Sequence, residues 1–346
     1  MDWILDSFSK GEVSALNIFL YASLATGIFK LLKTAYSLFC VVSESYLYSP
    51  VNFNRYGANS GKWAVITGAS DGIGKEYAFQ LAKRGFNIVM VSRTQSKLEA
   101  VSQEIESKYK TNTKVVAFDA STDAPENYEL LKKSLYDLPV TVLINNVGQS
   151  HSIPVPFMET SDEEMAQIIT LNNIVTLKVT KIVAPIIEET IAFKKNLHGL
   201  ILTMGSFAGL VPTPYLSTYS GSKAFLQNWS AALAGELEPK NIDVQLVISY
   251  LVTSAMSKIK RSSFTIPTPQ QFVSATLKNV GRRVGAQERF ATITPYPSHA
   301  LMHWAIDNFI GVYSKIVNKV NLNMHKSIRT RALKKAARIA AEKKVT

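Results

Sequence analysis

The sequence is poor in groups that stabilise a protein through covalent bonds or charge. It has one cysteine, Cys40, in 346 residues, which excludes an internal disulfide and agrees with a reducing compartment. Only 18% of the residues are charged and 47% are hydrophobic, a balance that excludes a disordered polar chain. The sequence has no internal repeat and no low-complexity segment, which excludes a solenoid. The length suits one large domain of about 250 residues with attachments.

The excess of positive charge is concentrated at one end of the chain. The formal net charge is +12, and residues 324–346 contain eight Lys or Arg against one acid, Glu342. The basic character therefore belongs mostly to a tail, and no nucleic-acid partner is expected. Two interpretations of this tail stay open: contact with anionic lipid headgroups, and a solvated helix that aids solubility.

The amino-terminal segment predicts a membrane-spanning helix. Residues 13–29 hold no charge, and the apolar character continues past Lys30 and Lys33 to Val42. About 20 apolar residues cross a bilayer as a helix, and lysines near its end extend their side chains to the headgroups. We therefore expect a transmembrane anchor at 13–43, with a buried core helix as the alternative.

The flanking charges predict the orientation of this anchor. A cleaved signal peptide would begin with basic residues, whereas this chain begins with Asp2 and Asp6. Acids before the span and lysines after it favour a lumenal start and a cytosolic remainder. Residues 1–12 are thus expected in the lumen, in a single-pass topology.

From residue 62 onward, short apolar runs alternate with helical patterns. The run 140–144 is apolar on both faces, as a central parallel strand should be. Repeated alternation of strand and helix predicts an α/β fold, a Rossmann-type doubly wound parallel sheet with right-handed crossovers. The expected strands are 63–67, 87–91, 113–118, 140–144, 199–204, 242–248 and 290–294, and the first helix is 73–83. We expect a linker at 44–61, the main domain at 62–295, and a helical extension at 296–346.

A glycine-rich turn follows the first expected strand. Gly68 allows a tight exit from the strand, while Gly72 and Gly74 let backbone amides and a helix terminus approach a pyrophosphate. The spacing Gly-x-x-x-Gly-x-Gly differs from that of the commonest dinucleotide fingerprint. The turn alone is therefore a weak signal.

Tyr219 and Lys223 form a second motif, with Ser206 thirteen residues before the tyrosine. Four-residue spacing on a helix places the phenol and the ammonium on one face. A phenol loses its proton near pH 10, and a neighbouring cation favours the phenolate and lowers that pKa. Combined with a nucleotide-binding turn, this pair predicts the acid/base of a carbonyl reductase; a surface tyrosine beside a solvated lysine is the alternative.

Together these motifs resemble the short-chain dehydrogenase/reductase family over about residues 60–295. Asn145-Asn146-Val147-Gly148 follows the fourth strand, where the family has Asn-Asn-Ala-Gly. Asp119 stands where the family's aspartate meets the adenine, and Asn172 matches the catalytic asparagine, with its neighbour Asn173 as the rival. The resemblance implies that a metal is not needed.

The family's mechanism implies a role for each catalytic position. Tyr219 would donate a proton to the carbonyl oxygen as hydride arrives, and Ser206 would hold that oxygen in place. Lys223 would lower the pKa of the tyrosine and bond the nicotinamide ribose. Asn172 would anchor a water that reconnects the lysine to solvent.

The end of the second strand bears on the choice of cofactor. An acid here would hold the ribose hydroxyls of NAD and repel a 2′-phosphate, whereas this chain has Ser92-Arg93-Thr94, with Lys97 one turn on. NADPH is therefore expected, with Arg93 as the principal phosphate partner because Asp71 stands where some relatives carry a basic residue. The cofactor contacts implied are Gly68, Ser70, Asp71, Gly72, Ile73, Gly74, Arg93, Lys97, Asp119, Asn146, Gly148, Asn172, Tyr219, Lys223, Val252 and Thr253. Ser249-Tyr250 departs from the Pro-Gly of many relatives, while Val252-Thr253 still fits the carboxamide loop.

A closer resemblance joins these motifs to the anchor and the tail. The segments 56–57, 145–153, 249–256 and 327–337 are similar to the microsomal 3-oxoacyl-CoA reductases of fatty-acid elongation, a subfamily related to membrane-bound 17β-hydroxysteroid dehydrogenases. The resemblance implies reduction of very-long-chain 3-oxoacyl-CoA with NADPH, and partnership with the elongase, the dehydratase and the enoyl reductase. A steroid or retinoid reductase and a non-enzymatic scaffold of the elongation complex are the alternatives.

The carboxyl terminus predicts the same location. Lys343 and Lys344 stand fourth and third from the end, the pattern of a dilysine retrieval signal. A cytosolic tail behind a membrane anchor would place this signal where it is read. We expect a protein of the endoplasmic-reticulum membrane with a cytosolic catalytic domain and carboxyl terminus.

The segment 299–320 predicts an amphipathic helix after the last expected strand. Its apolar residues recur at helical spacing and would form one stripe: Leu301, Met302, Ala305, Ile306, Phe309, Val312, Tyr313, Ile316 and Val320. An amphipathic helix lying on the membrane would shorten the path of a long acyl chain to the active site. A helix facing the protein core is the alternative.

Overall fold

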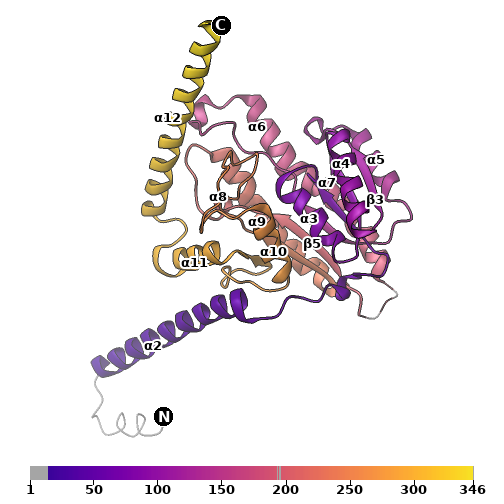
Figure 1. Ribbon diagram of the computed structural model, residues 1–346. Coiled ribbons are helices and arrows are strands. Elements are labelled where there is room, and N and C mark those ends of the chain that lie inside the picture. Colours follow the sequence, from indigo (N-terminus) through magenta and orange to yellow (C-terminus); the bar gives the residue numbers. More distant parts are fainter. Residues whose placement is uncertain (1–14, 193, 195, 346) are drawn as a thin grey trace.

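The computed structural model describes residues 15–192, 194 and 196–345 (Figure 1). The expected lumenal segment 1–12 lies outside these residues. The side chains of the dilysine pair, Lys343 and Lys344, are likewise not described.

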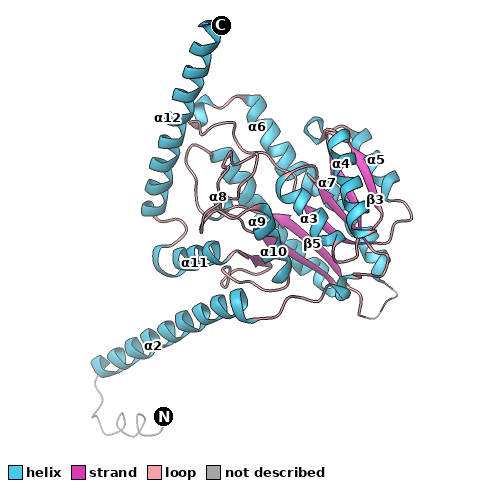
Figure 2. Cartoon of the chain, viewed as in Figure 1, coloured by secondary structure: helices cyan, strands magenta, loops and turns pink. Residues whose placement is uncertain are grey.

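A seven-stranded parallel sheet forms the centre of the molecule (Figure 2). Its strand order is β3-β2-β1-β4-β5-β6-β7, which reverses between β1 and β4. The strands are β1 Trp63–Thr67, β2 Asn87–Ser92, β3 Thr113–Ala117, β4 Val140–Asn145, β5 Gly199–Met204, β6 Ile242–Val247 and β7 Thr292–Ile293. The predicted doubly wound fold is confirmed, and ligands of such folds bind where the order reverses, at the carboxyl ends of the strands.

Helices cover both faces of the sheet and bury two apolar cores. One face carries α3 Gly72–Ala82, α4 Gln95–Tyr109 and α10 Pro269–Lys278; the other carries α5 Pro125–Leu135, α7 Val175–Ile191 and α9 Ser217–Leu237. Successive residues of a strand point to opposite faces. Along β1, Ala64 and Ile66 accordingly enter the first core and Val65 the second. Burial on both sides explains why the central strands are continuous apolar runs.

The first described helix, α2 Ala15–Val42, has two different halves. Residues 16–33 are exposed on every side, whereas Ser37 and Val41 are buried against the main domain. Leu16–Leu47 is the helical stretch of the described chain that is long and apolar enough to cross a membrane. The last turns of the expected anchor 13–43 therefore belong to the packed domain.

The segment expected as a linker, 44–61, is also packed. A π-helical turn, η1 Ser43–Leu47, continues α2, and a 3₁₀ turn, η2 Phe53–Tyr56, follows. The rings of Phe53 and Tyr56 are buried in the first core. These aromatic side chains make the segment an integral part of the main domain, which corrects the expectation of a linker.

The carboxyl-terminal extension is a bent pair of helices. Helix α11, Pro297–Ala305, ends in a π-helical turn, η7 Ile306–Ile310, and α12 Lys315–Val345 follows after a break. The break falls at Gly311, whose φ of 84° lies in the left-handed region that glycine tolerates. The expectation of one continuous helix over 299–320 is therefore wrong.

The expected apolar stripe of this extension is divided between core and surface. Met302, Ile306 and Val312 pack against a third core cluster around Phe207 and Leu210. Leu301, Phe309, Tyr313, Ile316 and Val320 are exposed. The core-facing alternative thus holds for one part of the segment, and membrane contact of the exposed part stays a prediction.

Candidate active site

The glycine turn after β1 is held by an asparagine from the neighbouring strand. Gly68 has a φ of 67°, and a Cβ on Gly74 would lie 2.1 Å from the carbonyl oxygen of Gly68. The side-chain nitrogen of Asn146 donates to the carbonyl oxygens of Thr67, at 3.0 Å, and Gly68, at 3.3 Å. This close packing brings the first turn of α3 against the end of β1, where helix amides are available to an anion.

Two polar side chains shape the edge of this turn. Asp71 caps α3, with its carboxylate accepting from the amide of Gly72 at 2.7 Å. The hydroxyls of Ser70 and Ser92 lie 2.9 Å apart and connect the turn to the end of β2. The expected turn residues therefore lie together at the switch point of the sheet.

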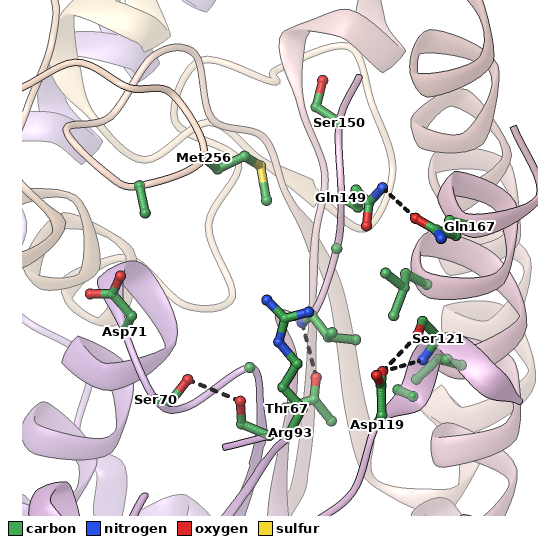
Figure 3. Close-up of a pocket in the computed structure, with 18 of the residues that line it drawn as sticks. Thr67, Ser70, Asp71, Arg93, Asp119, Ser121, Gln149, Ser150, Gln167 and Met256 are labelled. Carbon is green, nitrogen blue, oxygen red and sulfur yellow. Dashed lines mark hydrogen bonds between the residues drawn. The ribbon is translucent and has the colours of Figure 1, made fainter. Parts of the chain in front are cut away.

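A cavity of about 710 Å³ opens beside this turn (Figure 3). Its lining includes six of the expected cofactor contacts: Gly68, Ser70, Asp71, Arg93, Asp119 and Gly148. Lys97 is exposed on α4 and is not part of that lining. A cleft of this size and position suits an extended dinucleotide.

Arg93 and Asp119 form the polar end of the cavity. In Figure 3 both side chains stand at the ends of neighbouring strands, β2 and β3. The amide and hydroxyl of Ser121 bond the carboxylate of Asp119, at 2.9 and 2.7 Å. These bonds, with a smaller contribution from the Arg93 guanidinium, hold the pKa of Asp119 below its usual value. Arg93 thus offers a cation and Asp119 a fixed acceptor on the same wall.

The three expected acid/base residues meet between β5 and α9. Ser206 caps the short helix α8, Phe207–Leu210, and its hydroxyl is hydrogen-bonded to that of Tyr219. Tyr219 and Lys223 lie one turn apart on α9, with the ammonium 6.0 Å from the centre of the phenol ring. The Lys223 ammonium donates to the carbonyl oxygen of Met204 at 2.8 Å. The arrangement joins a proton donor, an orienting hydroxyl and a buried cation.

The electrostatics of this trio differ from the expectation. Burial raises the pKa of Tyr219, and the hydrogen bond with Ser206 only opposes that rise. Burial also lowers the pKa of Lys223, to about 8. The expected lowering of the tyrosine pKa by the lysine is absent here, because the ammonium bonds the Met204 carbonyl and is itself desolvated. The phenol is consequently a well-protonated acid near neutral pH.

Asn172 lies in a π-helical turn, η5 Thr170–Ile174, between helices α6 Asp162–Ile169 and α7. Its carbonyl oxygen accepts from the amide of Gln149 at 2.7 Å, and its nitrogen donates to the Ser222 hydroxyl at 2.8 Å. The rival Asn173 instead donates to the carbonyl oxygen of Ser222, at 2.9 Å. Turns of this type inside helices often occur at functional sites. Geometry favours Asn172, since it reaches the strand-end loop.

Gly148 connects the cavity with the catalytic side chains. A Cβ at this position would lie 3.0 Å from the Asn172 oxygen and 3.5 Å from the Lys223 nitrogen. Gly148 also lines the cavity, whereas Tyr219, Lys223, Ser206 and Asn172 do not. Two of the expected catalytic residues, Asn172 and Lys223, therefore lie directly behind the part of the cavity wall that Gly148 forms.

The remaining expected cofactor contacts lie next to the cavity and outside its lining. Val252 is buried in the first core, and the amide of Thr253 donates to the carbonyl oxygen of Pro267 at 3.0 Å. Gly72, Ile73, Gly74 and Asn146 likewise stand behind the lining. These residues position the backbone at the edge of the cavity.

The cavity also contains residues that the sequence interpretation missed. They include Gln149, His151, Ser152, Gln167, Met256 and Lys258. The side chains of Gln149 and Gln167 are bonded at 3.2 Å, and the Lys258 ammonium donates to the Ser152 carbonyl oxygen at 2.7 Å. The polar run that follows Gly148 was a usable signal, because loops at strand ends line such sites.

Comparison with known proteins agrees with this geometry. Residues 62–263 match the family described as short chain dehydrogenase. The very-long-chain 3-oxoacyl-CoA reductase of Candida albicans is 65% identical over 97% of both chains, and that of Lodderomyces elongisporus is 67% identical over 93% of both.

Two solved structures show the same fold with a nicotinamide cofactor. A short-chain dehydrogenase from Sphingobium yanoikuyae in complex with NADPH has a TM-score of 0.59 and 27% identity, over 71% of this chain and 92% of that one. The 3-ketoacyl-(acyl-carrier-protein) reductase from Brucella melitensis, complexed with NADH, has a TM-score of 0.57 and 25% identity, over 68% and 96%. These likenesses support a nicotinamide cofactor for this chain.

Proposed function

Because the chain belongs to the short chain dehydrogenase family, we propose that it reduces very-long-chain 3-oxoacyl-CoA to 3-hydroxyacyl-CoA with NADPH. The observation that carries this proposal is the 65% identity, over 97% of both chains, to a relative of that name. An identity of this extent includes the anchor and the tail as well as the main domain. The chemistry requires a hydride at the C3 carbonyl carbon and a proton at its oxygen.

The cavity fits the proposed cofactor. The glycine turn lets a pyrophosphate approach the amides of α3, since a side chain at Gly74 would meet the backbone of Gly68. NADPH, when bound, supplies the hydride. Asp119, held ionised by Ser121, would accept from the adenine.

The catalytic residues act on the carbonyl oxygen. Ser206, bonded to Tyr219, orients the substrate oxygen, and the Tyr219 hydroxyl gives its proton to that oxygen. The raised pKa of this phenol keeps the proton available in the direction of reduction. Lys223 brings a buried ammonium to this group and would bond the nicotinamide ribose. Asn172, bonded to the backbone of Gln149, positions the loop beside the lysine.

The preference for NADPH rests on the wall at the end of β2. Ser92-Arg93-Thr94 holds no acid, so a 2′-phosphate meets no repelling charge. Arg93 lines the cavity there, and a guanidinium binds phosphate through paired hydrogen bonds. Lys97, outside the lining, contributes little.

We place this activity on the cytosolic face of the endoplasmic-reticulum membrane. The exposed apolar residues of α2 support anchoring, and the lysines at 343 and 344 support retrieval. Such a location brings the protein to the elongase, the dehydratase and the enoyl reductase, which would supply the substrate and consume the product.

One assay separates this proposal from the reduction of a steroid. NADPH oxidation is followed with the purified, membrane-reconstituted protein, with 3-oxoacyl-CoA and a 17-ketosteroid offered side by side. We expect a kcat/KM for the acyl-CoA that exceeds the value for the steroid by orders of magnitude. A preference for the steroid would overturn the substrate assignment while leaving the cofactor chemistry intact.

A further inference from the structure

Helix α11 packs against the last turns of α2, at the point where the anchor joins the main domain. The indole nitrogen of Trp304, on α11, donates to the hydroxyl of Ser37, on α2, at 2.9 Å, and both residues are buried. The ammonium of Lys33 pairs with Glu288 at 3.0 Å. Helix α2 is thus fixed to the domain by its last turns.

Further bonds hold the continuation of α2. The carboxylate of Glu44 accepts from the amide of Val284, at 2.5 Å, and from the side chain of Gln287. The Lys278 ammonium donates to the carbonyl oxygen of Ser45 at 3.0 Å. These contacts leave the domain little freedom to rotate about its anchor.

The exposed half of α2 has the length of a bilayer core. Residues 16–33 are exposed on every side, and 18 helical residues extend about 27 Å, close to the roughly 30 Å of bilayer hydrocarbon. The membrane boundary therefore falls near Lys33, directly beside the contact between α2 and α11.

The bend between α11 and α12 presents an apolar surface on the same side. We call residues 306–316 the hairpin tip. Phe309 is 71% exposed, Tyr313 82% and Ile316 68%. The Phe309 ring packs edge-on against Trp304, with centroids 5.4 Å apart, so the tip begins two residues beyond the contact with α2. Figure 1 shows α11 and this bend alongside α2.

The polar groups of the tip are compatible with burial in lipid. Asp307 pairs with Arg289, at 3.2 Å, and with the buried ring of His303, at 3.1 Å, so its charge is neutralised on the protein side. The side chain of Asn308 donates to the carbonyl oxygen of Trp304. Lys315, near the end of the tip, and Lys319, just beyond it, are exposed, and lysines at such positions reach anionic headgroups.

We propose that the hairpin tip, 306–316, inserts into the cytosolic leaflet beside α2 and fixes the catalytic domain on the membrane. This inference rests on the proposed membrane anchoring. Large apolar side chains gathered on an aqueous surface favour association with an apolar partner. Lipid is the occupant, because α2 enters the bilayer next to the tip. Ile306 and Val312 of the tip pack against the third core cluster, whose Phe207 follows Ser206 in the sequence.

The test measures the surroundings of single spin labels in the full-length protein, reconstituted at one protomer per nanodisc. With Cys40 replaced by alanine, labels are attached to Tyr313→Cys in the tip, Leu24→Cys in α2 and Tyr136→Cys as an exposed control (Tyr136 is 76% exposed). We expect oxygen to reach the labels at 24 and 313 several-fold better than a water-soluble nickel chelate does. The order should reverse at 136.

The outcomes test insertion of the tip separately from anchoring by α2. If 24 lies in lipid and 313 in water, insertion of the tip is overturned and the anchoring stands. If 24 also lies in water, the anchoring itself fails. Low access of both reagents at 313 would indicate a protein partner, which also overturns the inference. Ile316→Cys repeats the measurement in case Tyr313→Cys does not fold.

Discussion

The proposed catalytic centre and the proposed membrane side of this protein, where α2 packs on α11, are built in different ways. Tyr219 and Lys223 lie four residues apart on one helix, and the glycine turn is one continuous segment. Ser37 and Trp304, in contrast, form a buried hydrogen bond across 267 positions of the sequence. The first region brings together motifs that are each a short segment of sequence, whereas the second region has no local motif and exists only through long-range packing.

This difference separates the chemistry of the enzyme from its proposed placement on the membrane. We expect the proposed catalytic side chains to set the rate, and their loss should leave the membrane side intact. The contacts between α2 and α11 set the orientation of the domain and should affect the rate little. Substitutions in each region can therefore test whether the two are independent.

The largest effect should come from Tyr219→Phe. Only the proton donor is lost, so we expect kcat to fall about 100- to 10,000-fold, with the affinity for NADPH nearly unchanged. Single-turnover NADPH oxidation and fluorescence titration of the cofactor measure the two quantities. Near-normal turnover would show that another group is the acid.

Ionisation of Lys223 should make kcat/KM for NADPH depend on pH near neutrality, which ionisation of Tyr219 should not. Its pKa, lowered to about 8 by burial, means that the ammonium loses its charge as the pH rises through that value. We expect kcat/KM for NADPH to fall above about pH 8, since this parameter reports groups of the free enzyme. Lys223→Ala should lower activity and cofactor affinity together and abolish this step. An unchanged step in the variant would assign it to a different residue.

The sheet and the order of the motifs could be predicted because each depends on neighbouring residues. Apolar runs such as 140–144 coincide with β4, and the glycine turn precedes α3 as expected. The last strand is the exception, because β7 spans only Thr292–Ile293 within the expected 290–294. The strand β7 is short because it lies at the edge of the sheet.

The rest depended on three-dimensional context. Nothing near Ser37 in the sequence indicates that Trp304 covers it, so the boundary between anchor and domain was not predictable. Burial raises the pKa of Tyr219, and a sequence motif does not indicate how deeply its residues are buried. The catalytic roles of Asn172, Ser206, Tyr219 and Lys223 stay predictions until the variants are measured.

Arg93→Asp should change the choice of cofactor. A charged hydrogen bond to phosphate contributes about 1.5–3 kcal/mol, so we expect NADPH affinity to fall about 10- to 100-fold and NADH affinity to change little. Lys97→Asp is the matched control, since it alters charge on the neighbouring helix outside the cavity lining. Competition titrations with both cofactors give the ratio. Equal losses for NADPH and NADH would move the 2′-phosphate site elsewhere.

The smallest effect should arise on the membrane side, from Trp304→Phe. This change keeps most of the ring packing and removes the donor to Ser37, so we expect the free energy of unfolding to fall by about 1 kcal/mol. Activity at saturating substrate should be unchanged, because neither residue contacts the cavity. Thermal unfolding in mild detergent, with NADPH oxidation as the parallel assay, measures both.

Ser37→Ala completes this test as a double-mutant cycle. Each single change breaks the same bond, so the two effects should not add, and the double variant should resemble the less stable single one. Additive effects would mean that the two side chains stabilise the protein separately. A large loss of kcat in Trp304→Phe would contradict the independence of the two regions, because it would show that the packing of α2 on α11 also sets the geometry around Ser206.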